Sequence, residues 1–108
     1  MIIVDDRIID RARAALTVIA REARIRAAFL FGSYVEGEAD EFSDIDIAAF
    51  IDGLENWDLN RRMREAIEPQ REVGDDIELH FFPAELLVNP PKASFAAYIQ
   101  NHGVKIDL

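Results

Sequence analysis

The segment Ser43-Asp44-Ile45-Asp46-Ile47 constrains the fold of this chain more than any other stretch, because acidic and apolar side chains alternate in it. Consecutive side chains on a β-strand point to opposite faces of the sheet. Asp44 and Asp46 therefore share one face, with Cα atoms roughly 6.6 Å apart, while Ile45 and Ile47 face the other. A one-residue slip would bury both acids, so the alternation predicts a strand with a polar site on one face and an apolar core on the other.

Size and charge limit the class of protein. The chain has 108 residues, half of them hydrophobic, which predicts one domain over residues 1–108. Its formal charge of −9 would repel nucleic acids and anionic membranes, so neither is expected as a partner. The sequence has no cysteine, and no segment approaches the ~18 apolar residues of a membrane span. We therefore expect a cytoplasmic protein.

Apolar periodicity predicts helices alternating with short strands. Helices are expected over residues 5–22, 54–68 and 90–102, and strands over residues 26–31, 43–50, 75–82 and 104–108. Pro69 is expected to end the second helix. The apolar residues of that helix are expected to face inward: Leu59, Met63, Ala66 and Ile67. The strands are too few for a large doubly wound sheet, so we expect an α/β fold of the two-layer α+β kind, a small mixed sheet with helices packed on one face.

A glycine-serine turn and further carboxylates accompany the acidic strand. Gly32-Ser33 follows an apolar strand, and glycine lets a backbone approach a phosphate group closely. Glu78 lies on the polar side of the third strand, and Asp76 has the same parity. Paired carboxylates suit Mg²⁺, which usually shares its ligand shell with substrate phosphates. Two such cations about 3.5–4 Å apart can stabilise both the attacking and the leaving oxygen of a phosphoryl displacement.

The order Gly32-Ser33, Gly37 and Ser43-Asp44-Ile45-Asp46 resembles the signature of the minimal nucleotidyltransferases, small members of the polymerase-β-like superfamily. The resemblance covers nearly the whole chain and implies a nucleotidyltransferase fold. It implies that Gly32, Ser33 and Ser43 bind the nucleotide. It also implies a catalytic set that holds two Mg²⁺ ions: Asp44, Asp46 and Glu78. Asp46 would bridge the ions, Asp44 would bind the nucleotide-associated ion, and Glu78 would bind the second ion, with Asp76 as the alternative to Glu78.

The resemblance also implies a reaction and a partner. The reaction is transfer of a nucleoside monophosphate, AMP as the first choice, from a nucleoside triphosphate such as ATP to a hydroxyl group. Minimal members of the family are often paired with a helical HEPN-type protein as antitoxin and toxin. A hydroxyl of such a partner is therefore the expected acceptor, and a homodimer is the alternative assembly.

Two departures from the family pattern keep other functions open. The family usually has aspartate at the position of Glu78. It commonly has arginine in the connection that is acidic here: Glu36, Glu38, Asp40 and Glu41. Like charges cost about 1 kcal/mol at 4 Å in water and about 4 kcal/mol near a protein surface. This favours, as alternatives, a catalytically silent module that neutralises its partner by contact, or a surface that binds divalent ions or a basic protein. His80 is expected to be packed or on the surface.

Overall fold

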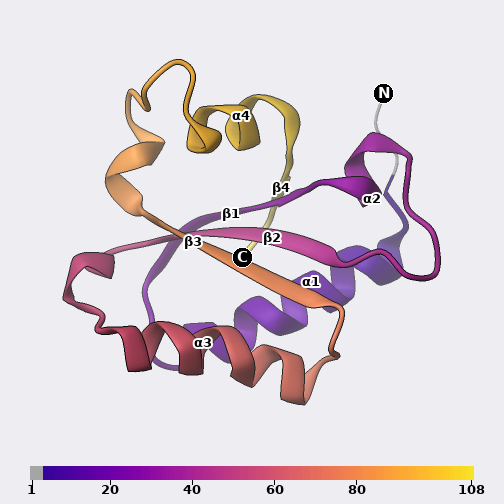
Figure 1. The fold of residues 1–108 in the computed structure, drawn as a ribbon, viewed down its shortest axis with the longest axis horizontal. Helices are drawn as coiled ribbons and strands as arrows, with labels where there is room; N and C mark the ends of the chain where they lie inside the picture. The colour runs from indigo at the N-terminus through magenta and orange to yellow at the C-terminus, as the bar shows by residue number, and fades with distance from the viewer. Residues whose placement is uncertain (1–3) are drawn as a thin grey trace.

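The computed structural model describes residues 4–108 and contains a four-stranded sheet with helices on both faces (Figure 1). The elements follow one another as α1 (Asp6–Ala20), β1 (Ile25–Phe31), α2 (Ser33–Glu36), β2 (Ile45–Ile51), η1 (Leu54–Asn56), α3 (Leu59–Glu72), β3 (Ile77–Pro83), η2 (Ala84–Leu87), α4 (Phe95–His102) and β4 (Val104–Ile106). The strand order is β3-β2-β1-β4. Strand β1 is antiparallel to β2 and β4, and β2 is parallel to β3, so the predicted mixed sheet is confirmed.

Each face of the sheet has its own apolar cluster, because side chains alternate along every strand. Ile45 and Ile47 of β2 are fully buried in the cluster that also contains Leu16 of α1. On the opposite face, Phe50 packs in a cluster that contains Ile99 of α4. The two long helices, α1 and α3, share one face as expected, whereas the short helix α4 departs from the expectation of helices on one face and covers part of the other (Figure 1).

Helix α3 differs from its predicted form. It begins after η1, where the Asp58 side chain accepts a hydrogen bond from the backbone N–H of Arg61, and it continues past Pro69 to Glu72. The prediction that Pro69 ends the helix is therefore wrong. The predicted inward face is also wrong, since Leu59 is 71% exposed and Met63 is 53% exposed. Ile67 is exposed as well, whereas Glu65 and Pro69 are buried.

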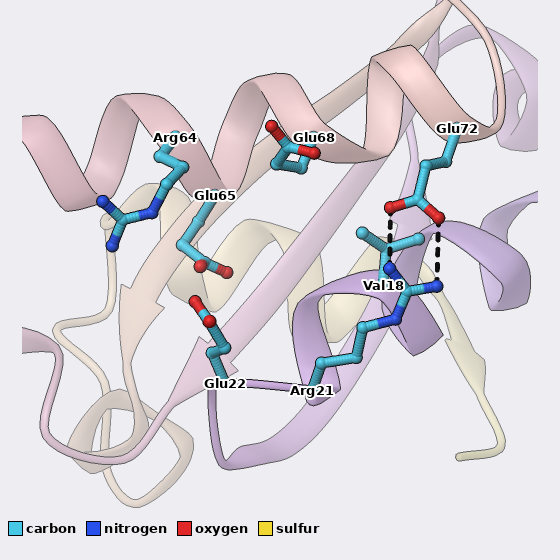
Figure 2. Close-up of a pocket in the computed structure, with 7 residues that line it drawn as sticks. All are labelled: Val18, Arg21, Glu22, Arg64, Glu65, Glu68 and Glu72. Atoms are coloured by element: carbon cyan, nitrogen blue, oxygen red, sulfur yellow. Dashed lines mark hydrogen bonds and ion pairs between the residues drawn. The ribbon is translucent and has the colours of Figure 1, made fainter.

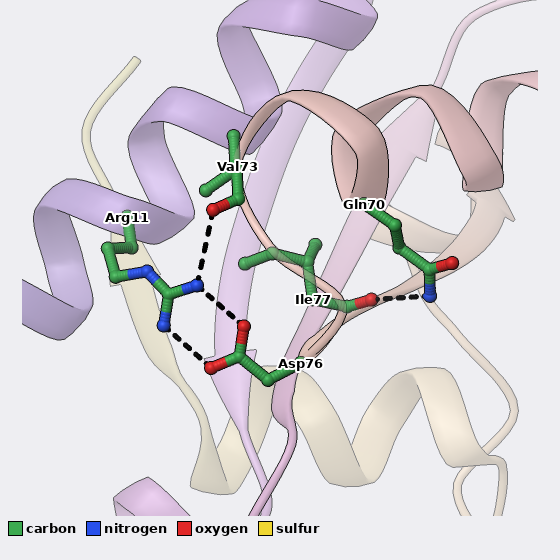
Figure 3. Close-up of polar contacts among 5 residues, drawn as sticks. All are labelled: Arg11, Gln70, Val73, Asp76 and Ile77. Atoms are coloured by element: carbon green, nitrogen blue, oxygen red, sulfur yellow. Dashed lines mark hydrogen bonds and ion pairs between the residues drawn. The ribbon is translucent and has the colours of Figure 1, made fainter.

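An ion pair attaches the start of β3 to α1. The Arg11 guanidinium donates two hydrogen bonds of 2.6 Å to the Asp76 carboxylate and a third, of 3.5 Å, to the carbonyl oxygen of Val73 (Figure 3). The side-chain amide of Gln70 donates to the carbonyl of Ile77 at 2.8 Å. Two helices thus position the first residue of β3, and with it the residues that follow on the polar face.

Between residues 4 and 108, no helix combines the length and the apolar character that a membrane crossing requires.

Candidate active site

Strand register brings two predicted carboxylates together. Asp46 and Glu78 are directly opposite each other in the parallel pair of β2 and β3. Asp46 is also opposite Phe31, the last residue of β1, on its other side. His80 lies two residues beyond Glu78 and therefore on the same face. Asp46, Glu78 and His80 each offer a ligand atom within 4.8 Å of the other two.

His80 belongs to this group, although from the sequence it was expected to be packed or on the surface. Its Nε2 atom lies 3.2 Å from Oδ1 of Asp46 and 3.8 Å from Oε1 of Glu78. Its ring contacts those of Phe31 and Phe95, with centroids 5.0 and 6.2 Å away. The imidazole is thus packed, as expected, and also faces both carboxylates. Its parity with Glu78 was the signal in the sequence, but parity alone does not show which strand lies alongside.

Gly32 places the backbone of the glycine-serine turn against Asp46. Its φ of 82° and ψ of −149° lie in a region that only glycine adopts readily. A Cβ atom at this position would lie 2.5 Å from Oδ2 of Asp46, which is closer than real Cβ contacts. Ser33 then begins the single turn α2, which ends at Gly37 in a left-handed conformation. Glycine is therefore required at residue 32 both by the backbone conformation and by the carboxylate beside it.

The site concentrates negative charge. Burial, followed by the charge of Asp46, raises the pKa of Glu78, and the nearby His80 partly offsets this rise. A raised carboxyl pKa means that the ionised form lacks compensating positive charge. Carboxylate oxygens are the ligands that Mg²⁺ prefers. The donor set of Asp46 and Glu78 therefore fits a divalent cation.

Other predicted residues lie outside this group. Asp44 is exposed and precedes β2, and its charge makes the smallest contribution to the raised pKa of Glu78. The Ser43 hydroxyl accepts a hydrogen bond from the backbone N–H of Asp40 and donates one to its carboxylate. Asp76, the alternative to Glu78, is paired with Arg11, which lowers its pKa. The structure therefore brings Glu78, and not Asp76, to Asp46.

The acidic connection that runs from the last residue of α2 to β2 is exposed. This holds for all four of its acids: Glu36, Glu38, Asp40 and Glu41. Glu36 is attached to α4, because the Tyr98 hydroxyl donates a hydrogen bond of 2.9 Å to its carboxylate. The connection is thus solvated and anchored at one end.

Comparison with known proteins agrees with this geometry. The family model described as polymerase beta, nucleotidyltransferase matches residues 15–105. The crystal structure of a candidate nucleotidyltransferase from Sulfolobus solfataricus has a similar fold, with a TM-score of 0.59 and 19% sequence identity, covering 79% of this chain and 75% of that one. No curated protein matches the chain at a significant level. The resemblance inferred from the sequence is confirmed, and the chain belongs to the polymerase β nucleotidyltransferase family.

Proposed function

We propose that this chain transfers a nucleoside monophosphate, with ATP as the donor, to a hydroxyl group, and that Asp46 and Glu78 hold Mg²⁺ for this reaction. Membership of the family supports the reaction class. The observation that carries the proposal is the convergence of the two carboxylates beside the glycine-serine turn. The proposal includes a second ion bound with the help of Asp44, and a cytoplasmic location, where ATP is available.

Each residue has a distinct task in this proposal. Bound at the site, Mg²⁺ would neutralise charge on the phosphate oxygens. The backbone N–H of Gly32 and the hydroxyl and N–H of Ser33, at the start of α2, would donate hydrogen bonds to the triphosphate. The raised pKa of Glu78 makes its ionised form a stronger base, which suits removal of the proton from the acceptor hydroxyl.

The acceptor is proposed to be a hydroxyl of another protein. The side chains of Asp46 and Glu78 are 22% and 50% exposed, so a group on a partner surface can reach them from solvent. A HEPN-type helical protein is the proposed partner, and a second copy of this chain is the alternative.

The proposal is tested by titrating Mg·ATP into the native chain and into Asp46→Asn. Loss of the Asp46 charge should weaken binding at least about tenfold, since a hydrogen bond or ion contact to a charged group is worth roughly 1.5–3 kcal/mol. Asp75→Asn is the matched control, because Asp75 is exposed and carries the same charge close to β3. This variant should bind Mg·ATP as the native chain does.

Transfer itself is tested with a candidate HEPN partner and ATP labelled at the α- or γ-phosphate. Nucleotidyl transfer puts only the α-label on the partner, whereas phosphoryl transfer puts only the γ-label there. Label from neither position, together with no binding of Mg·ATP, would support the second candidate, a catalytically silent module. The exposed acidic connection favours that candidate, and so does the position of Asp44 outside the cluster of Asp46, Glu78 and His80.

A further inference from the structure

His80 has no part in the proposed reaction, although its imidazole lies against both carboxylates of the candidate active site. Its Nε2 atom is 3.2 Å from Oδ1 of Asp46 and 3.8 Å from Oε1 of Glu78. Within residues 4–108, these three side chains form the group whose ligand atoms all lie within 4.8 Å of one another. The imidazole nitrogen is therefore available wherever the two carboxylates hold an ion.

The distances suit neighbouring ligands of one ion. Two ligand atoms that are each about 2.1 Å from a metal ion, at a right angle, lie about 3.0 Å apart, and two opposite ligands lie about 4.2 Å apart. The separations of Nε2 from the oxygens of Asp46 and Glu78 fall within this range. A charge-assisted N–H···O hydrogen bond is usually shorter, at about 2.7–2.9 Å. The spacing therefore fits an ion shared by the three side chains better than a strong hydrogen bond between histidine and carboxylate.

Aromatic side chains hold the imidazole of His80 in place. The Phe31 ring meets it edge to face, with centroids 5.0 Å apart, and the Phe95 ring lies 6.2 Å away. The site remains open to solvent, because the side chains of His80 and Asp46 are 28% and 22% exposed. His80 thus offers a fixed nitrogen atom that a dissolved ion can reach.

The donor set differs from one made of carboxylates alone. Asp44 is exposed and lies outside the three-ligand group, so the group consists of two carboxylates and one imidazole. Mg²⁺ takes oxygen ligands, whereas imidazole suits first-row transition metals. An ion that binds all three side chains is therefore expected to be a transition metal.

We propose that Nε2 of His80 is a third ligand of the ion held by Asp46 and Glu78, and that it makes the site selective for a first-row transition-metal dication, such as Mn²⁺, over Mg²⁺. This inference rests on the proposed function, because it concerns the same metal site. Mg²⁺ would bind through the two carboxylates and complete its shell with water and phosphate oxygens. A transition metal would bind the imidazole in addition.

The first test is pulsed electron paramagnetic resonance of the chain loaded with Mn²⁺ alone, after labelling its histidines with ¹⁵N. We expect the coupling of a directly bound ¹⁵N atom in the native chain and its loss in His80→Gln. The chain has two histidines, and the other, His102, is exposed on α4. His102→Gln is therefore the matched control and should keep the coupling. The native chain and this control together remain informative even if His80→Gln disturbs folding.

The second test measures the affinity of the native chain and of His80→Gln for Mn²⁺, and for Mg²⁺ by competition with bound Mn²⁺. We expect the ratio of the Mn²⁺ affinity to the Mg²⁺ affinity to fall at least about tenfold in His80→Gln, since even the partners of metal ligands are worth about 10–100-fold in affinity. The affinity for Mg²⁺ should change less than about threefold, because this ion binds through oxygen. If His80 only orients Asp46, both ions should lose affinity equally and no coupling to ¹⁵N should be seen.

The two tests separate failure of this inference from failure of the proposed function. Mn²⁺ bound without a ¹⁵N coupling, or with the same selectivity in the native chain and in His80→Gln, would overturn the role of His80 and leave the proposed function intact. Absence of metal binding to the native chain would overturn both. The same holds for Mn²⁺ binding that is unchanged in Asp46→Asn, because the ion would then lie elsewhere.

Discussion

Replacing Gly32 by alanine tests whether the glycine-serine turn and Asp46 form one unit. The new Cβ would lie 2.5 Å from Oδ2 of Asp46. The carboxylate cannot turn away freely, because its Oδ1 atom is 3.2 Å from Nε2 of His80. Either the turn or the Asp46 side chain must therefore move. Gly37 offers a matched control with a similar φ of 78°, where a Cβ would meet no atom within 4 Å.

The structure gives a different expected cost for the two substitutions. For Gly32→Ala, the glycine-only backbone region costs roughly 1–3 kcal/mol, and pushing Asp46 out of its rotamer adds about 0.5–1.5 kcal/mol. For Gly37→Ala, the left-handed conformation alone costs about 1–2 kcal/mol. The excess cost at Gly32 therefore combines the more restricted backbone conformation, with ψ of −149° against 18° at Gly37, and the contact with Asp46.

Urea unfolding measures the difference in stability between the variants. Titration with Mn²⁺, a spectroscopic substitute for Mg²⁺, measures the affinity of the site for metal. We expect Gly32→Ala to lower the free energy of unfolding by about 2–4 kcal/mol and to weaken metal binding. Gly37→Ala should be less destabilised and should bind the metal as the native chain does. If both variants lose the same stability and keep the same affinity for Mn²⁺, the argument that Gly32 supports Asp46 is refuted.

Two further substitutions test the helical face of the sheet. Arg11→Met removes the paired hydrogen bonds to Asp76 and should lower the free energy of unfolding by about 1–2 kcal/mol. The value is modest because both side chains are about one third exposed. An unchanged free energy of unfolding in urea would contradict this expectation. Burial and the charge of Glu22 raise the pKa of Glu65 in the folded protein above its ordinary value of 4.5. The protonated carboxyl therefore favours folding at pH values below 4.5, and this contribution to the free energy of unfolding is lost as the pH rises through the pKa of the folded state. Glu65→Gln should therefore stabilise the chain at pH 8 and have little effect at pH 4, as measured by urea unfolding at both pH values; equal effects at the two pH values would contradict the assignment.

The acidic strand could be predicted from the sequence because its two faces differ in character. Ile45 and Ile47 are fully buried, whereas the Asp46 side chain lies on the opposite face beside Glu78 and His80, as the alternation requires. The parity of Glu78 indicated its face correctly as well. The register that places Glu78 opposite Asp46 depends on how β3 aligns with β2. That alignment is a long-range property, which no local pattern encodes.

The orientation of α3 could not be predicted in the same way. The spacing of Leu59, Met63 and Ile67 indicates a helix with an apolar stripe, but these side chains are exposed. The structure instead buries Glu65 and Pro69. Periodicity shows that a helix has two faces, and tertiary contacts decide which of them turns inward. Here the inward face carries Glu65, which lines the pocket between α1 and α3 (Figure 2), so tertiary packing and not periodicity decides which residues of this helix are buried.

Helix α4 contacts both His80 in the candidate active site and the acidic connection beside it. The Phe95 ring packs on His80, which contacts Asp46, and Tyr98 donates a hydrogen bond to Glu36 in the acidic connection. The imidazole therefore reaches the carboxylates from a position that α4 helps to define. Because the same short helix contacts both the His80 side and the connection, a displacement of α4 would change the surroundings of Asp46 from two directions. The arrangement of Asp46, Glu78 and His80 thus depends on a helix that contributes none of these three residues.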